Sequence, residues 1–217
     1  MFMKTEYNDL CNVPVIMLTF EEKELQPVRD EIAKIQRSFE SATTVNHHLV
    51  GNIEQEYKLT ESIDTIQQLL APCIDHEKNQ NWTLHSHDVN SGSSRLTLDE
   101  VWVNFMKKHE FNPIHNHTGV WSFVIWMEVP YDIEDERSVV MSKNSKCPSS
   151  GYFSFMYANG MGSIQTEEIP VDKTFRNRAV LFPSKLHHCV YPFSSTDDYR
   201  ISVSGNFKFK SIETYED

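Results

Sequence analysis

Two histidines separated by one residue, His115 and His117, precede a run of aromatic and β-branched residues in the stretch NPIHNHTGVWSFVIWMEVP. Alternate residues of a strand point to the same face of a sheet, so both imidazoles can converge on one point. A later segment, LFPSKLHHCVYP, supplies a second pair, His187 and His188. Because neighbouring strand residues face opposite ways, only one of this pair can join the first two. The pattern predicts a three-point metal site that leaves other coordination positions open for substrate and oxygen.

Other histidine groups are weaker candidates for this metal site. His47 and His48 are adjacent, so a strand would direct at most one of their rings toward a metal. The stretch HSHD at residues 85–88 repeats the H-x-H spacing, but it runs directly into a loop rich in Ser, Gly and Asn. The letters HNH also name a nuclease motif, which needs a basic surface facing DNA. A net charge of −11 argues against that motif and against nucleic-acid partners in general.

Length and composition indicate one soluble globular domain, residues 1–217, with enough chain for a substantial core. Hydrophobic residues make up 39% of the chain, and no window is long and apolar enough to span a bilayer. The four cysteines show no paired spacing, and the first residues, MFMKTEYNDLCNVP, lack the pattern of a secretory signal. We therefore expect reduced thiols, a cytoplasmic location and no membrane partner. The sequence is compatible with a homo-oligomer.

The first part of the chain, residues 1–92, carries a mostly helical pattern. Apolar residues between 28 and 39 fall on one stripe of an amphipathic helix, and Pro27 suits its first turn. A second apolar stripe over residues 63–74 follows Thr60, which we expect to be the N-cap of that helix. We expect both helices to form a support layer.

Residues 93–210 have the amino-acid composition of a series of strands. Short runs rich in Val, Ile, Phe, Tyr and Trp alternate with turn residues. The runs are RLTLDEVWVNFM, WSFVIWMEV, GYFSFMY, GSIQTEEI, AVLFPS and YRISVSGNFKF. Helices followed by many short strands favour a mainly β fold, a sandwich or barrel with the helical layer packed on it.

The order of these motifs resembles a known enzyme family. H-x-H, an aromatic strand, FPSKLHH and then YRISVSGNF look like the Fe(II)- and 2-oxoglutarate-dependent oxygenases. The nearest pattern is that of a bacterial and phage subgroup with H-x-H where most members carry H-x-D or H-x-E. The stretch NHHLVGNIEQEY is also similar to the N-terminal part of phage-type members. The resemblance covers roughly residues 95–210 through its motifs. It implies a double-stranded β-helix, a cupin-like jelly roll, with the metal at its open end.

The resemblance also implies roles for individual residues. The metal ligands and catalytic residues would be His115, His117 and His188, with His187 pointing away. Arg200 and Ser202 match the R-x-S element that binds the far carboxylate of 2-oxoglutarate, and Asn104 is expected to add a polar contact to this cosubstrate. The residue types suit these roles, because a guanidinium pairs with a carboxylate through two hydrogen bonds and a hydroxyl two residues along the strand adds a donor.

The implied activity is that of an Fe(II)-dependent dioxygenase. With O2, 2-oxoglutarate would yield succinate and CO2, and a C–H bond of an unidentified substrate, a small molecule or a protein side chain, would be hydroxylated. His117 stands where the usual triad has a carboxylate, so Glu128 or another acid could complete the metal shell. Two alternatives are a three-His dioxygenase that needs no 2-oxoglutarate and a non-catalytic metal-binding jelly-roll protein. A phage-encoded member would act in the host cytoplasm.

Overall fold

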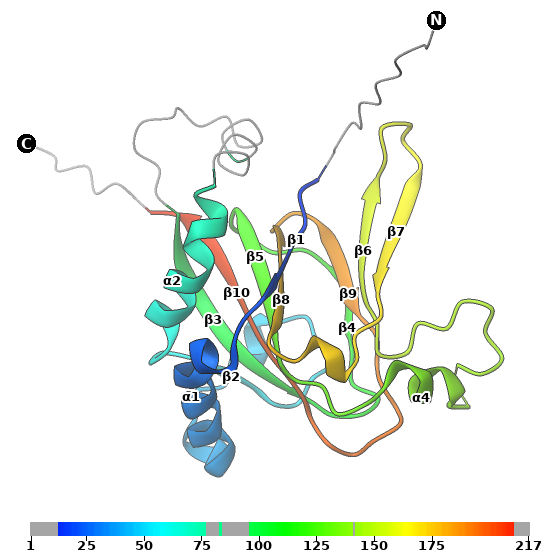
Figure 1. Ribbon diagram of the computed structural model, residues 1–217, viewed down its shortest axis with the longest axis horizontal. Coiled ribbons are helices and arrows are strands. Elements are labelled where there is room, and N and C mark those ends of the chain that lie inside the picture. The colour runs from blue at the N-terminus through cyan, green and yellow to red at the C-terminus, as the bar shows by residue number, and fades with distance from the viewer. Residues whose placement is uncertain (1–12, 77–82, 84–95, 141, 211–217) are drawn as a thin grey trace, which may run out of the picture.

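The computed structural model describes residues 13–76, 83, 96–140 and 142–210, which form two antiparallel sheets (Figure 1). The larger sheet has six strands in the order β1 (Ile16–Thr19), β8 (Arg178–Pro183), β5 (Trp121–Glu128), β10 (Arg200–Phe209), β3 (Leu96–Met106) and β2 (Glu56–Lys58). The smaller sheet has four, in the order β4 (Asn112–His115), β9 (His187–Val190), β6 (Phe153–Ala158) and β7 (Ile164–Ile169). Two sheets of this kind form a double-stranded β-helix, as the family resemblance implies.

The strongest strands are those that the sequence predicts. The six runs of aromatic and β-branched residues correspond to β3, β5, β6, β7, β8 and β10. Strand β5 is buried along nearly its whole length, because helices cover one face of its sheet and the smaller sheet faces the other. Strands β1 and β2, which form the two edges of the larger sheet, are not among the runs that the sequence predicts as strands.

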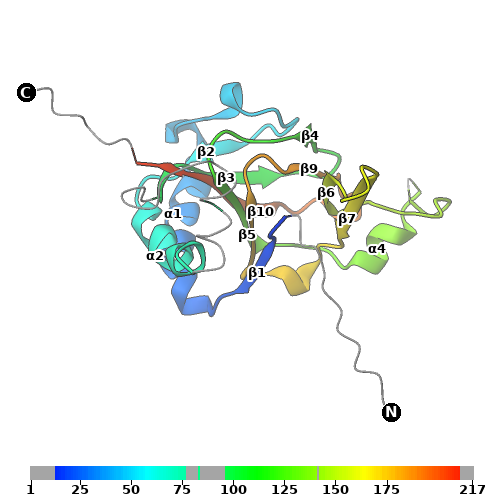
Figure 2. The ribbon, with the colours of Figure 1, turned by 90° about the horizontal axis from the view of Figure 1, so that it is seen from above.

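Two helices, α1 (Gln26–Arg37) and α2 (Ile63–Ile74), cover the outer face of the six-stranded sheet (Figures 1 and 2). Buried side chains of α1 and α2, such as Ile32 and Ile66, pack in one cluster with Val103 and Phe105 of β3. Hydrophobic burial of this kind, at about 25 cal/mol per Å², is the main force that holds the helices on the sheet. The two helices thus form a layer on this face of the sheet.

The start of α2 differs from the prediction. Its N-cap is Ser62 instead of Thr60, and the carboxylate of Glu31 on α1 accepts hydrogen bonds from the backbone N–H groups of residues 60, 61 and 62, at 2.6, 2.9 and 2.8 Å. Burial opposes the charge on Glu31, but these bonds outweigh it and hold the pKa of Glu31 below its ordinary value. The residues that lead into α2, up to its N-cap, are therefore held by a side chain distant in sequence, which a local capping rule does not reveal.

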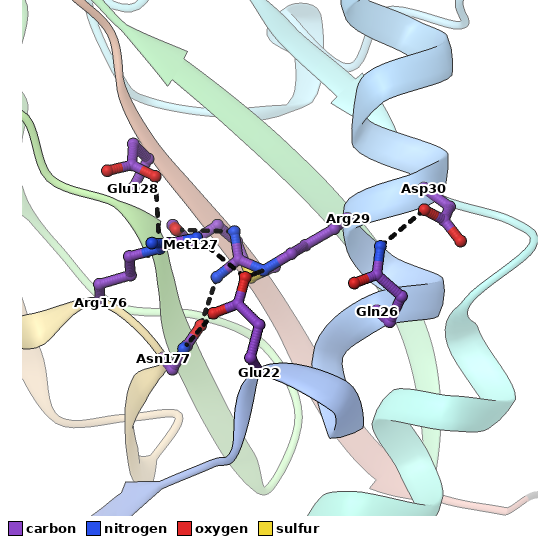
Figure 3. A network of polar contacts seen from close by, with 8 residues as sticks. All are labelled: Glu22, Gln26, Arg29, Asp30, Met127, Glu128, Arg176 and Asn177. Atoms are coloured by element: carbon purple, nitrogen blue, oxygen red, sulfur yellow. Dashed lines mark hydrogen bonds and ion pairs between the residues drawn. The ribbon is translucent and has the colours of Figure 1, made fainter.

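A polar network ties α1 to the larger sheet (Figure 3). Arg29 of α1 donates to the backbone oxygen of Met127 at 3.2 Å and to the side chain of Asn177, and it pairs with Glu22 at 3.0 Å. Because these contacts reach the end of β5 and the start of β8, they fix the helix across the strands that carry the core.

The two sheets enclose a second apolar cluster, which includes Trp126, Phe153, Phe155 and Phe182. Seen from above, β4, β9 and β6 lie on the side of the larger sheet that faces away from α1 and α2 (Figure 2). Among the described residues, the remaining short elements are α4 (Ile133–Ser138) and four 3-10 turns, at Glu22–Leu25, Phe39–Ser41, Asn46–His48 and Lys173–Phe175. In the part of the chain described, no helix is long and apolar enough to cross a membrane.

Candidate active site

A cavity of about 240 Å³ opens between the two sheets. The smaller sheet and the loop after β4 contribute three histidines to its wall, and the larger sheet contributes a row of polar side chains. The lining residues include His115, His117, His188, Glu56, Asn104, Asn112, Arg200 and Ser202. The predicted metal-binding and cosubstrate-binding groups thus share one cavity.

His115, His117 and His188 form a compact group, with their candidate ligand atoms all within 4.8 Å of one another. His115 on β4 and His188 on β9 are directly opposite partners in the antiparallel register. His117 lies just past the end of β4, so the two motif histidines do not share one regular strand as expected. Its backbone N–H donates to the oxygen of Ser184 at 2.8 Å, which holds the loop beside β9. The three rings converge as a metal site requires.

Backbone carbonyls fix the protonation of two of these rings. Nδ1 of His115 lies 2.7 Å from the oxygen of Pro113, and Nδ1 of His188 lies 2.9 Å from the oxygen of Leu186. A carbonyl oxygen only accepts, so each Nδ1 carries the proton and donates it. This leaves Nε2 of both rings with a free lone pair, which is the arrangement that metal-binding histidines use.

All three imidazoles are neutral at physiological pH. Burial lowers the pKa of His115, and burial together with the neighbouring His115 lowers the pKa of His117 to about 4. Burial and the two other imidazoles hold the pKa of His188 well below its ordinary value. A divalent cation needs deprotonated ligands, and here little free energy is spent on removing protons.

Arg200 is buried, with 3% of its surface exposed, yet no carboxylate pairs with it among the described residues. It donates to the hydroxyl of Tyr131 at 2.7 Å and to the backbone oxygen of Gly151 at 3.2 Å, and its guanidinium lies over the ring of Phe193. These neutral contacts orient the cation without compensating its charge. Burying an uncompensated charge is costly, so a bound anion is the expected partner.

Ser202 and Asn104 stand next to this arginine on the same face of the sheet. Ser202 follows Arg200 by two residues on β10 and lies opposite Asn104 on β3. The Asn104 amide donates to the hydroxyls of Ser202 and Ser204, each at 3.3 Å. Because Ser202 thereby accepts a bond, its own hydroxyl hydrogen is free to point at a ligand.

The residues present fit an iron ion and 2-oxoglutarate. Three neutral imidazole donors suit a divalent transition metal, and a buried unpaired guanidinium beside a hydroxyl suits a carboxylate. Glu128 does not complete the metal shell, because it is half-exposed and pairs with Arg176 at 3.5 Å in the network on the outer side (Figure 3). Within the described ranges, no carboxylate joins the histidine group.

The remaining sequence candidates lie elsewhere. His187 is exposed and contacts Asn116, so it faces away from the histidine group as predicted. His47 and His48 stack on each other in a 3-10 turn instead of a strand, and His48 borders the cavity without joining the group. The HSHD stretch at residues 85–88 falls outside the described residues.

Sequence reasoning missed three residues of the cavity region. Tyr131, just before α4, accepts a hydrogen bond from Arg200. Glu56 and Asn112 line the cavity, and each has a buried oxygen without a hydrogen-bond partner among the described residues. No sequence motif gives these residues a role. The pairing of β2 with β3 brings Glu56 to the site, and the pairing of β4 with β9 brings Asn112 there.

Comparisons with known proteins agree with this geometry. Residues 100–206 match the family described as "Putative 2OG-Fe(II) oxygenase". No curated protein matches the sequence. A prolyl-4-hydroxylase from Pseudomonas putida shares the fold at 14% identity and a TM-score of 0.52, over 90% of this chain and 92% of that one.

Two further solved structures share the fold. A Trichoplax adhaerens prolyl hydroxylase, in complex with a peptide fragment of the hypoxia inducible factor oxygen degradation domain, aligns at 13% identity and a TM-score of 0.52 over 89% of this chain and 83% of that one. The 2-oxoglutarate-dependent epimerase SnoN from nogalamycin biosynthesis aligns at 11% identity and a TM-score of 0.51, over 89% and 76%. Residues 100–206 therefore correspond to a domain of the Fe(II)- and 2-oxoglutarate-dependent oxygenases, a family of enzymes that use Fe(II), 2-oxoglutarate and O2.

Proposed function

We propose that this protein is a hydroxylase in which His115, His117 and His188 hold Fe(II), and Arg200 and Ser202 hold the far carboxylate of 2-oxoglutarate. The observation that carries the proposal is the buried guanidinium of Arg200 in the same cavity as three neutral imidazoles. A site for a metal alone would not need an unpaired buried cation. The arginine therefore favours the use of 2-oxoglutarate over a three-His dioxygenase that binds its substrate directly.

The chain's contribution is to hold and orient. The carbonyls of Pro113 and Leu186 keep two rings in the tautomer that presents Nε2, and the backbone bond to Ser184 fixes the third histidine. When bound, Fe(II), 2-oxoglutarate and O2 supply the oxidising chemistry, which gives succinate, CO2 and a hydroxylated C–H bond.

Contacts around Arg200 fix the position of its guanidinium and so the position at which the far carboxylate of 2-oxoglutarate would bind. Tyr131 stacks on Phe193 with ring centroids 4.9 Å apart, and both pack against the guanidinium. Asn104 holds the hydroxyl of Ser202 in place, so we assign it a positioning role for the cosubstrate. These contacts pre-orient the groups that bind the carboxylate, which lowers the entropy lost on binding.

Solved structures with this fold come from enzymes with different classes of substrate. The Trichoplax relative binds a peptide and SnoN belongs to a small-molecule pathway, so the shared fold accepts either kind of substrate. For this chain we propose a small molecule or a protein side chain that enters the cavity mouth near His48, Leu49 and Val50.

Succinate formation tests the proposal. Purified protein is incubated with Fe(II), 2-oxoglutarate and O2, with and without a cell extract, and succinate is measured. We expect succinate from wild type and from His187→Ala, whose ring is exposed, and none from His188→Ala. Equal succinate from wild type and His188→Ala would contradict the proposal.

A further inference from the structure

Glu56 is a buried carboxyl group that the proposed reaction does not use. It lies on β2, lines the cavity and has 1% of its surface exposed. It is the direct cross-strand partner of Asn104 on β3, which in turn pairs with Ser202 on β10. Paired residues of neighbouring strands share one face, so Glu56 ends the polar row that continues to the proposed cosubstrate site.

This carboxyl lacks an adequate partner. Oxygen Oε1 of Glu56 has no hydrogen bond within the described residues, and Oε2 lies 3.4 Å from the amide nitrogen of Asn46. That nitrogen has two hydrogens and makes shorter contacts with the backbone oxygens of Ile53 and Glu54, at 2.6 and 3.2 Å. No cation pairs with Glu56 in the described part of the chain, and the negative Glu110 is near enough to disfavour its charge.

Two more buried oxygens of the cavity wall are also unpartnered. They are Oδ1 of Asn104 and Oδ1 of Asn112, and each can only accept a hydrogen bond. The nitrogen of Asn104 already donates to the backbone oxygen of Ser202, at 3.4 Å, which fixes which amide atom is free. Three unsatisfied acceptors around one cavity, one of them a carboxyl, call for an occupant with several N–H donors and a positive charge.

We propose that Glu56 recognises a cationic group of the substrate, a protonated amine or a guanidinium, carried on an aliphatic stem. This inference rests on the proposed function, because it assigns the substrate end of the same cavity. Leu49, Val50 and Ile53 line the cavity in the segment just before Glu56, so an apolar stem would pass them on its way to the carboxyl. Arg200 and Glu56 then have opposite roles, one for the anionic cosubstrate and one for a cationic substrate.

Proton release gives this site a distinctive behaviour. Burial and the nearby Glu110 raise the pKa of Glu56 to about 8, so the empty site is mostly neutral at pH 7. A bound ammonium favours the carboxylate, and Glu56 must then release its proton to solvent. Binding of a cation near pH 7 is therefore accompanied by release of nearly one proton.

The probes are n-butylammonium and its neutral isostere 1-butanol, titrated by ligand-observed NMR, with proton release followed in weakly buffered solution. We expect wild type to prefer the ammonium by about tenfold or more, and Glu56→Gln to lose this preference and the proton release. Glu100→Gln is the matched control, because Glu100 borders the same cavity but is exposed. It should keep the preference within about threefold.

Equal binding of the two probes by wild type, or an unchanged preference in Glu56→Gln, would overturn the inference. Ni(II) and 2-oxoglutarate binding are measured separately on the same proteins, and the amine titration is run with and without them. If wild type binds Ni(II) and 2-oxoglutarate but not the ammonium, this inference fails and the proposed function stands. If it binds the ammonium but not 2-oxoglutarate, the proposed function fails and the cation site at Glu56 stands. A large loss of Ni(II) affinity in Glu56→Gln would make Glu56 a metal ligand and would also overturn the inference.

Discussion

Replacing Glu56 with Gln should change how stability depends on pH. The pKa of Glu56 is raised from 4.5 to about 8 by burial, so between these values the folded protein holds a proton that the unfolded chain has released. The free energy of unfolding therefore falls as pH rises through this window, by about 1.4 kcal/mol per pH unit. The window of about 3.5 units corresponds to about 5 kcal/mol. Water in the cavity reduces this figure, and we expect about 2–5 kcal/mol.

Urea denaturation of the metal-free proteins, followed by tryptophan fluorescence, measures this effect at about pH 5 and about pH 9. The Gln side chain in Glu56→Gln cannot titrate. From about pH 5 to about pH 9, the free energy of unfolding of the variant should therefore rise relative to that of wild type by about 2–5 kcal/mol. Other groups titrate in both proteins and cancel in the difference. Glu100→Gln, at an exposed position, should show a constant difference from wild type. If the difference for Glu56→Gln is also constant, the carboxyl titrates normally and the reasoning is wrong.

Further predictions concern the cosubstrate and the fold. Arg200→Ala should weaken 2-oxoglutarate binding to the Ni(II)-loaded protein by about 30-fold or more. Arg178→Ala, which removes a cation that lies over the half-buried Phe175 ring, should not. Equal affinities in calorimetry would refute this. Tyr131→Phe removes an acceptor from Arg200 and should weaken 2-oxoglutarate about threefold to tenfold with metal binding unchanged; a change in metal binding instead would argue against it. Glu31→Ala should lower the free energy of unfolding by about 2–4 kcal/mol, and exposed Glu40→Ala by less than about 0.5, in urea titrations; similar losses for both would contradict the capping role.

Sequence patterns predict the strands whose own residues are mostly apolar. Strands β5 and β10 are rich in aromatic and β-branched residues, and β5 is buried along nearly its whole length. Strand β2, with only Glu56, Tyr57 and Lys58, has no such pattern, because its burial depends on β3 beside it. The N-cap of α2 differs from the predicted Thr60 for a similar reason, since a carboxylate from α1 binds the backbone N–H groups of Ser62 and of the two residues before it.

Some features of the candidate site can likewise be predicted from the sequence, and others cannot. Alternation along a strand predicts that only one of His187 and His188 can face the other histidines, and the family resemblance implies that it is His188, which lies in the histidine group. The missing counter-charge of Arg200 and the burial of Glu56 could not be predicted, because both depend on what other strands place around them. In the sequence, IEQEYK has the acidic composition of an exposed segment, and only the fold turns Glu56 into the cavity.

The most direct test of the account is an anaerobic titration of the protein with Fe(II) and 2-oxoglutarate, followed by the visible charge-transfer absorption that appears when the keto acid chelates bound iron. Both proposed binding sites must be present and adjacent for this absorption to form. We predict that it saturates at one Fe(II) per chain in wild type and in His187→Ala, and that it is absent in His188→Ala. Full absorption in His188→Ala, or none in wild type that has bound Fe(II), would contradict the assignment of this cavity as the iron and 2-oxoglutarate site.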